Sequence, residues 1–147
     1  MKNSIEVINL SKSYGVKEAV KNINFKIAEN EIIGLLGPNG CGKTTTIGML
    51  LGLLKPTKGD VLINGMRIEE NRINILKRIN FISPYIELPK KLTVKQNLIV
   101  YGKLYSVKNL NEKIDYLVSK LRLENLLSRV TGELSSGQKN RISLAKA

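Results

Sequence analysis

The chain has 147 residues, enough for one domain, and its 42% hydrophobic content is typical of a soluble globular protein. One cysteine excludes an internal disulfide, and the longest apolar run, residues 48–54, is too short to span a bilayer. The net charge of +12 is spread along the chain without interleaved aromatic residues. We interpret it mainly as solvated surface, with an acidic partner as the alternative, and do not expect nucleic acid binding. No apolar leader opens the chain, so we expect a cytoplasmic protein.

The first eighty residues predict short strands and helices separated by turns. Alternating apolar residues at 4–10 and 19–27 predict two half-buried antiparallel strands, joined by a turn at 12–15. The apolar run 31–36 predicts a buried strand, and the periodic segment 44–54 predicts a helix. The remaining predicted elements are a turn at 55–59, a strand at 60–64, a short helix at 72–78 and a strand at 79–82.

Helical periodicity begins after residue 83. Thr93 is the predicted N-cap of a helix that extends to Tyr105, and Asn111 is the predicted N-cap of the next helix. A last helix is predicted from near Gly137 to Ala147, where no stop signal follows, so we expect the sequence to be cut there. The two earlier helices have predicted core stripes of Val94, Leu98, Tyr101, Leu104 and Tyr105, and of Ile114, Leu117, Val118 and Leu121.

Residues 37–45 read G-P-N-G-C-G-K-T-T and fit the phosphate-loop pattern G-x-x-x-x-G-K-[ST]. The pattern lies between a predicted strand and a predicted helix, where backbone N–H groups can surround a polyphosphate at the positive end of the helix. Lys43 would reach the terminal phosphates, and the Thr44 hydroxyl would ligate Mg²⁺. The predicted phosphate-binding residues are Gly37, Pro38, Asn39, Gly40, Cys41, Gly42, Lys43, Thr44 and Thr45.

Nucleotide hydrolysis at such a loop also requires an acidic group that supports Mg²⁺ and a residue that positions water. In proteins with such a phosphate loop, these two groups usually come from a second buried strand that ends in Asp-Glu. The two aspartates, Asp60 and Asp115, do not end such a strand, and the chain contains no histidine. We therefore interpret residues 1–147 as a nucleotide-binding half that lacks a hydrolytic half.

Just before the last predicted helix, the sequence reads L-S-S-G-Q, which resembles the signature L-S-G-G-Q of ATP-binding-cassette (ABC) proteins. Together with the phosphate loop, it resembles the ATP-binding subunit of an exporter-type ABC transporter. The resemblance implies an α/β P-loop NTPase (RecA-like) core with an antiparallel β subdomain and a helical subdomain at about 84–132. The chain would be one incomplete domain, 1–147, truncated at its C-terminal side, without the Asp-Glu strand and the histidine switch region.

The resemblance also implies ligands and partners. Tyr14 would stack on adenine, with ATP and Mg²⁺ as cofactors. The signature residues would bind ATP held by a second ATP-binding subunit in a head-to-tail dimer. That dimer would drive a transmembrane permease from the inner face of the cell membrane, using ATP hydrolysis by the complete parent protein. The implied signature residues are Leu134, Ser135, Ser136, Gly137 and Gln138.

Two positions depart from the family pattern, and two other interpretations stay open. Ser136 replaces the first glycine of the signature, and Ser83 and Pro84 stand where a Mg²⁺-sensing glutamine is expected. One alternative is a vestigial or binding-only cassette, and the other is a soluble nucleic-acid-linked ABC protein. A GTPase is disfavoured because the chain has no N-K-x-D motif for guanine.

Overall fold

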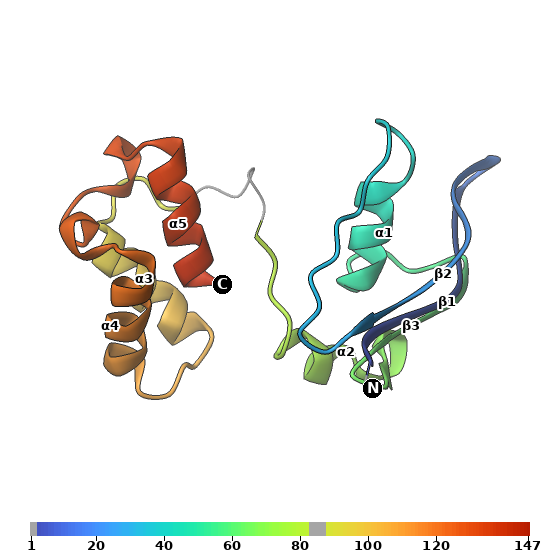
Figure 1. The fold of residues 1–147 in the computed structure, drawn as a ribbon, viewed down its shortest axis with the longest axis horizontal. Coiled ribbons are helices and arrows are strands. Elements are labelled where there is room, and N and C mark those ends of the chain that lie inside the picture. Colours follow the sequence, from blue (N-terminus) through green and yellow to red (C-terminus); the bar gives the residue numbers. More distant parts are fainter. Residues whose placement is uncertain (1–2, 83–87) are drawn as a thin grey trace. The chain divides into compact units, whose positions relative to one another are not determined.

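The protein is described by a computed structural model that covers residues 3–82 and 88–147. Ser83 and Pro84, which stand where a glutamine was expected, lie outside the described residues. The chain forms two compact units, residues 1–80 and residues 81–147, which Figure 1 shows as a sheet with helices and a cluster of helices. The predicted helical subdomain at 84–132 falls within the second unit, which also includes the last helix.

The first unit contains a four-stranded antiparallel sheet with strand order β2-β1-β3-β4. Two long strands, β1 (Asn3–Tyr14) and β2 (Lys17–Ala28), form a hairpin that confirms the predicted antiparallel pair. The predicted turn at 12–15 is wrong, because residues 12–14 continue the ladder and the chain turns at Gly15, where φ is 58°. Strands β3 (Lys58–Ile63) and β4 (Met66–Arg67) complete the sheet, and β3 matches the strand predicted at 60–64.

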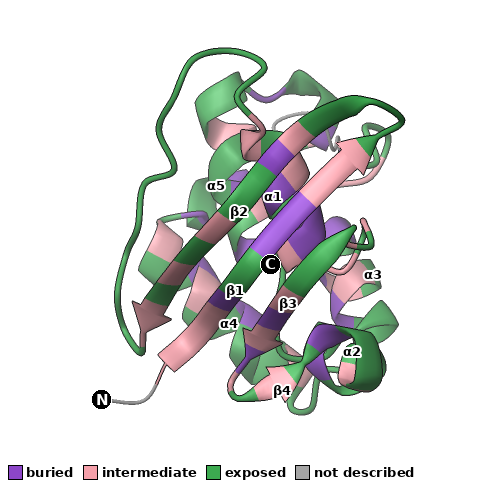
Figure 2. Ribbon diagram, turned by 90° about the vertical axis from the view of Figure 1, so that its right-hand side faces the viewer, coloured by how far each residue is buried: buried purple, intermediate pink, exposed green. Residues whose placement is uncertain are grey.

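Two helices contribute to the core of this unit. Helix α1 (Lys43–Leu50) is shorter than the predicted 44–54, and α2 (Ile68–Leu76) begins before the predicted 72–78. Figure 2 shows buried residues on β1, β2, β3 and α2. Because the side chains of a strand alternate between faces, one face of the sheet is covered while much of the other stays open. The buried core consists of Val7, Leu10, Val20, Met49, Val61, Ile63, Ile68 and Ile75.

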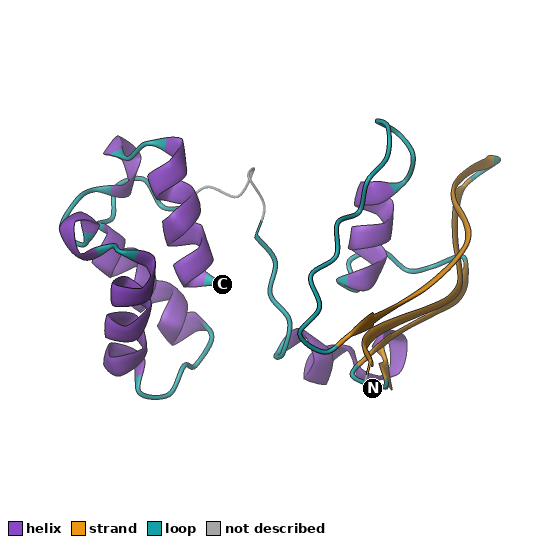
Figure 3. Ribbon diagram, in the orientation of Figure 1, coloured by secondary structure: helices purple, strands orange, loops and turns teal. Residues whose placement is uncertain are grey.

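The segment at 31–36, predicted as a buried strand, is neither a strand nor buried. Ile32 is 99% exposed and Leu36 is 91% exposed, and Figure 3 shows this part of the chain as a loop. No strand of residues 3–82 or 88–147 pairs with it, so its backbone makes no ladder and its apolar side chains have no covering layer. The strand predicted at 79–82 is wrong for the same reason.

The second unit packs three helices: α3 (Val94–Leu104), α4 (Leu110–Leu121) and α5 (Ser136–Lys146). Short 3₁₀ turns at η1 (Glu124–Leu126) and η2 (Thr131–Glu133) connect α4 to α5. Ile114 and Val118 of the predicted α4 stripe are buried, with Leu117 and Leu121 packed against them. The remaining buried core residues are Leu88, Val94, Leu98, Leu123, Leu126, Leu134, Ile142 and Ala145.

The structure tests the predicted helix ends. Thr93 caps α3 as predicted, in a capping box with Gln96. Asn109, rather than the predicted Asn111, precedes α4. Leu104 and Tyr105, predicted in the core stripe, are exposed, because α3 ends at Leu104 and the chain then turns through Ser106, where φ is 52°.

A buried polar cluster joins α3 to the segment before α5. The Asn97 amide Nδ2 donates to the Thr131 hydroxyl at 2.8 Å and to the Pro89 carbonyl at 3.2 Å. The Thr131 hydroxyl in turn donates to the Leu92 carbonyl at 3.0 Å. Asn97 is fully buried, and its Oδ1 accepts no hydrogen bond from the described part of the chain. This cluster fixes η2, and with it the residues just before α5, against the start of α3.

Candidate functional site

Residues 37–42 form the loop that leads directly into α1. Gly42 is the N-cap of α1, with φ of 95°, and no side chain caps the helix or places an acid in its first turn. Thr46 and Met49 are buried in the core and hold α1 in place. The first N–H groups of the helix therefore remain available, and the positive end of the helix dipole faces the loop.

Lys43 lies folded back into this loop. Its Nζ donates to the carbonyl oxygens of Gly37 and Pro38, each at 2.7 Å, and lies 3.7 Å from the Cys41 sulfur. In the described residues Lys43 has no carboxylate partner. Because only uncharged groups contact the Lys43 ammonium, its positive charge is not compensated, and free helix N–H groups lie beside it. This combination suits the binding of a polyphosphate anion. Thr44 is exposed at the start of α1, as a Mg²⁺ ligand would be.

Gly42 is held tightly against β2. A Cβ atom at this position would collide with the carbonyl oxygen of Ala19 and lie 3.0 Å from a methyl group of Val20. The positive φ of Gly42 adds a backbone conformation that L residues rarely adopt. At Gly40, φ is 83°, but a Cβ atom there would meet nothing within 4 Å. Both glycines therefore permit a positive φ in the loop, but only Gly42 also permits the close approach of the backbone to the Ala19 carbonyl of β2.

We expect Gly42→Ala to destabilise the first unit much more than Gly40→Ala. Backbone strain costs about 1–2 kcal/mol at either position, whereas Gly42→Ala must also push α1 away from β2, for a total of about 3 kcal/mol or more. Urea unfolding of the two variants in parallel measures the difference. Equal losses of stability would contradict the close packing of Gly42 on Ala19.

Tyr14 lies at the end of β1 next to the hairpin turn, with 50% of its surface exposed. The Lys12 Nζ lies over its ring at 5.3 Å from the centroid. Tyr14 pairs with Lys17, and Ala19, which contacts the loop at Gly42, follows two residues later on β2. The β1–β2 hairpin therefore brings an exposed aromatic ring to the same end of the first unit as the loop at 37–42.

The L-S-S-G-Q motif forms the start of α5 in the second unit. Leu134 is buried, while Ser135, Ser136 and Gly137 are exposed. Ser135 and Gln138 form a capping box: the Gln138 N–H donates to the Ser135 hydroxyl at 3.3 Å, and the Ser135 N–H donates to the Gln138 side chain at 2.9 Å. This pairing was not among the predictions, although the S-x-x-Q spacing is a signal for it.

The two aspartates lie away from any buried strand end. Asp60 is in β3 and forms an ion pair with Arg67 at 3.4 Å, and Asp115 is exposed on α4. Across residues 3–82 and 88–147, no three His, Cys, Asp or Glu side chains gather where they could hold a metal ion. Within the same residues, none of the helices is long and apolar enough to cross a bilayer.

A glycine-rich loop that enters a helix beside an antiparallel hairpin, with a helical unit whose last helix opens at L-S-S-G-Q, defines an ATP-binding cassette. The family model described as "ABC transporter" matches residues 20–147. The chain therefore belongs to the ABC transporter family, which confirms the resemblance inferred from the two motifs.

Individual relatives agree with this assignment. The chain is 37% identical to the bacitracin transport ATP-binding protein BcrA of Bacillus licheniformis over 150 residues, all of this chain and 48% of that protein. It is 39% identical to the SkfA peptide export ATP-binding protein SkfE of Bacillus subtilis, over 97% of this chain and 60% of that protein. The chain thus spans about half the length of these relatives.

A solved structure supports the fold. The structure of cbiO1 from Clostridium perfringens, part of the ABC transporter complex cbiONQ, matches with a TM-score of 0.86 and 26% identity. The match covers 99% of this chain and 61% of cbiO1. The predicted α/β P-loop fold is therefore confirmed.

Proposed function

We propose that this chain is the nucleotide-binding portion of an ATPase subunit that powers an ABC exporter. The observation that carries the proposal is the Lys43 ammonium held by two loop carbonyls at the N-terminus of α1, with no carboxylate partner in the described residues. The names of the relatives, which refer to bacitracin transport and to peptide export, support the export direction.

In this proposal the loop binds the phosphates of ATP. Gly40 and Gly42 allow the backbone N–H groups to converge, and Lys43 exchanges its two carbonyl contacts for the β- and γ-phosphates. Thr44 and Thr45 stand in the first turn of α1, where the Thr44 hydroxyl can ligate Mg²⁺. Mg²⁺, when bound, neutralises phosphate charge and orients the phosphate chain for hydrolysis. Pro38, Asn39 and Cys41 contribute through the loop backbone.

Tyr14 would hold the adenine. Its exposed ring presents a flat π face, and the neighbouring Lys12 ammonium already uses that ring as a cation–π partner. The β1–β2 hairpin links Tyr14 to Ala19, which packs on the loop at Gly42. The adenine and the phosphates of ATP would therefore bind at the same end of the first unit.

The signature would act on the nucleotide of a second subunit. The Ser135–Gln138 capping box leaves the exposed N–H groups of Ser136 and Gly137 at the positive end of α5, which suits a phosphate. The proposed assembly is a head-to-tail dimer of ATP-binding subunits, attached to a permease at the inner face of the cell membrane.

Turnover by residues 1–147 alone is not expected. Asp60 is engaged by Arg67, and Asp115 lies on helix α4, so neither ends a buried strand of the kind expected to support Mg²⁺. This observation favours the second candidate function, a cassette that binds ATP without hydrolysing it. The two candidates share the binding step and differ in phosphate release.

Calorimetric titration of the chain with MgATP tests the shared step. We expect binding, with Tyr14→Ala weakening it about tenfold, because base–aromatic stacking contributes roughly 1–3 kcal/mol per base. Tyr116→Ala is the matched control, since Tyr116 is 54% exposed and lies on α4. A phosphate-release assay in the same samples should give only background. Binding that Tyr14→Ala leaves unchanged would remove Tyr14 from the site.

A further inference from the structure

The loop between α3 and α4 carries apolar side chains in solvent. We define the hairpin tip as residues 103–108, K-L-Y-S-V-K. Leu104 is 70% exposed, Tyr105 is 57% exposed and Val107 is 38% exposed. The tip comprises the last two residues of α3 and the connection to α4, which Figure 3 shows at one end of the helical unit. An aliphatic and an aromatic side chain therefore project from a protruding turn, where the helical core does not cover them.

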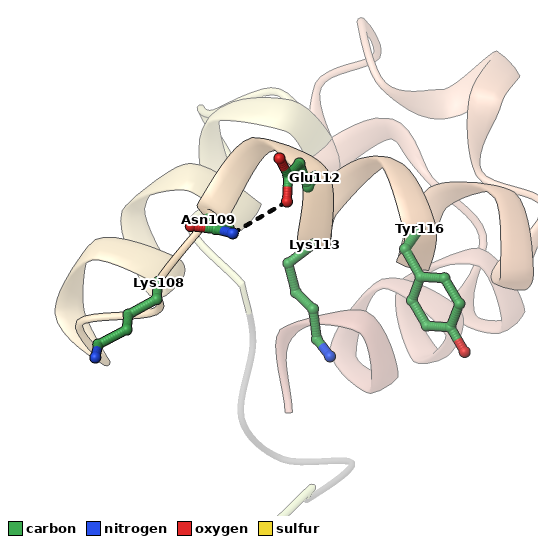
Figure 4. A pocket seen from close by; sticks show the side chains of 5 residues that line it. All are labelled: Lys108, Asn109, Glu112, Lys113 and Tyr116. Carbon is green, nitrogen blue, oxygen red and sulfur yellow. Dashed lines mark hydrogen bonds between the residues drawn. The ribbon is translucent and has the colours of Figure 1, made fainter.

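Basic side chains flank these apolar groups. Lys103 and Lys108 bound the tip, and Lys113 and Lys120 continue the basic surface along α4, on the stripe that includes Tyr116. Lys108, Lys113 and Tyr116 line a shallow pocket of about 280 Å³ together with Asn109 and Glu112. Figure 4 shows Lys108, Lys113 and Tyr116 extending to the same side, with Glu112 turned toward Asn109.

Lysines outnumber carboxylates on this surface, where Lys108, Lys113 and Lys120 stand against Glu112 and Asp115. In the described residues, Lys108 and Lys113 form no ion pair, and Glu112 accepts a hydrogen bond from Asn109 at 3.2 Å. The Lys120 Nζ donates to the Tyr116 hydroxyl at 2.9 Å, and this hydrogen bond raises the pKa of Lys120. Lys113 and Lys120 lie over the Tyr116 ring at 5.7 Å and 5.3 Å from its centroid. Asp115 lies on the neighbouring stripe of α4.

The second unit as a whole is basic. Residues 81–147 contain twelve Lys and Arg residues against five Asp and Glu residues, a net charge of +7. Exposed aliphatic and aromatic side chains within a basic surface match a membrane interface, where tyrosines sit at headgroup level and lysines meet lipid phosphates. An acidic protein segment explains the lysines but leaves the protruding Leu104 and Tyr105 without a role.

We propose that the hairpin tip binds the surface of a bilayer that contains anionic phospholipids. Leu104 and Tyr105 enter the headgroup region, and Lys108 and Lys113 contact lipid phosphates. The contact is peripheral and does not depend on nucleotide or on a permease. It therefore goes beyond the proposed function and can fail or succeed independently of it.

Co-sedimentation of the 147-residue chain with large vesicles tests the proposal. We expect binding to phosphatidylcholine vesicles with 30% phosphatidylglycerol and little binding to pure phosphatidylcholine. Because each lysine near an anionic surface is worth about a fivefold change in binding, the double variant Lys108→Glu with Lys113→Glu should reduce partitioning roughly 25-fold or more. Replacing Leu104 and Tyr105 by serine should reduce it about tenfold.

The matched control is the double variant Lys17→Glu with Lys77→Glu, which makes the same charge change at exposed positions of the first unit. It should bind vesicles as the parent chain does, and circular dichroism should show all variants folded. Equal loss in the control would overturn the assignment to the hairpin tip. So would equal binding to neutral vesicles, no vesicle binding at all, or capture of the tip by a poly-glutamate peptide without vesicle binding.

Discussion

Lys43→Ala is expected to weaken ATP binding by about 10- to 100-fold while the chain stays folded. The Lys43 ammonium is the one cation placed inside the described part of the phosphate loop, and hydrogen bonds to charged groups contribute roughly 1.5–3 kcal/mol each. The variant also removes the 2.7 Å hydrogen bonds from the Lys43 ammonium to the Gly37 and Pro38 carbonyls, which hold the loop together. Calorimetric titration with MgATP measures the loss directly.

Lys77→Ala is the matched control, because it removes the same charge from an exposed position after α2. It should bind ATP as the parent does. The nucleic-acid-linked alternative predicts that oligonucleotide binding survives Lys43→Ala, since that binding depends on the total charge of the surface. Unchanged ATP affinity in Lys43→Ala would refute the assignment of the loop as the phosphate site.

Asn97→Ala is expected to lower the stability of the helical unit by about 2–4 kcal/mol. The truncation leaves the Pro89 carbonyl without the amide hydrogen bond at 3.2 Å, and it opens a space beside Thr131 in a fully buried position. Both effects act where η2 is tied to the start of α3. Urea unfolding followed by circular dichroism at 222 nm measures the shift in the midpoint.

Asn111→Ala provides the comparison, because Asn111 is exposed on α4 and its loss should change stability by less than about 0.5 kcal/mol. ATP affinity should be unchanged in both variants, since neither residue belongs to the first unit. If Asn97→Ala unfolds at the same urea concentration as Asn111→Ala, the buried cluster is not a source of stability.

Local signals predicted the elements that depend on neighbouring residues. The Thr93 cap and the antiparallel pair β1 and β2 each follow from spacing within a few residues, whereas the phosphate-binding role of residues 37–45 stays a prediction. The family assignment rested on two such local motifs and was confirmed. The individual roles of Tyr14, Thr44 and the signature residues stay predictions.

Elements that depend on distant partners were not predicted correctly. The apolar run 31–36 has the composition of a buried strand, but a strand exists only when another strand pairs with it, and among the described residues none does. Leu104 and Tyr105 fit the helical period of α3, yet periodicity does not reveal that α3 ends at Leu104 and that the chain then turns through Ser106. The Asn97–Thr131 hydrogen bond joins residues 34 positions apart, beyond any local pattern.

The open segment at 31–36 has a practical consequence for handling the protein. Ile32, Ile33, Leu35 and Leu36 are exposed beside unpaired backbone groups, which is the arrangement that recruits a strand from a neighbouring molecule. Solubility should therefore fall steeply with protein concentration. Dilute samples, and a fusion partner placed at the N-terminus next to β1, are the conditions under which this chain is best purified and measured.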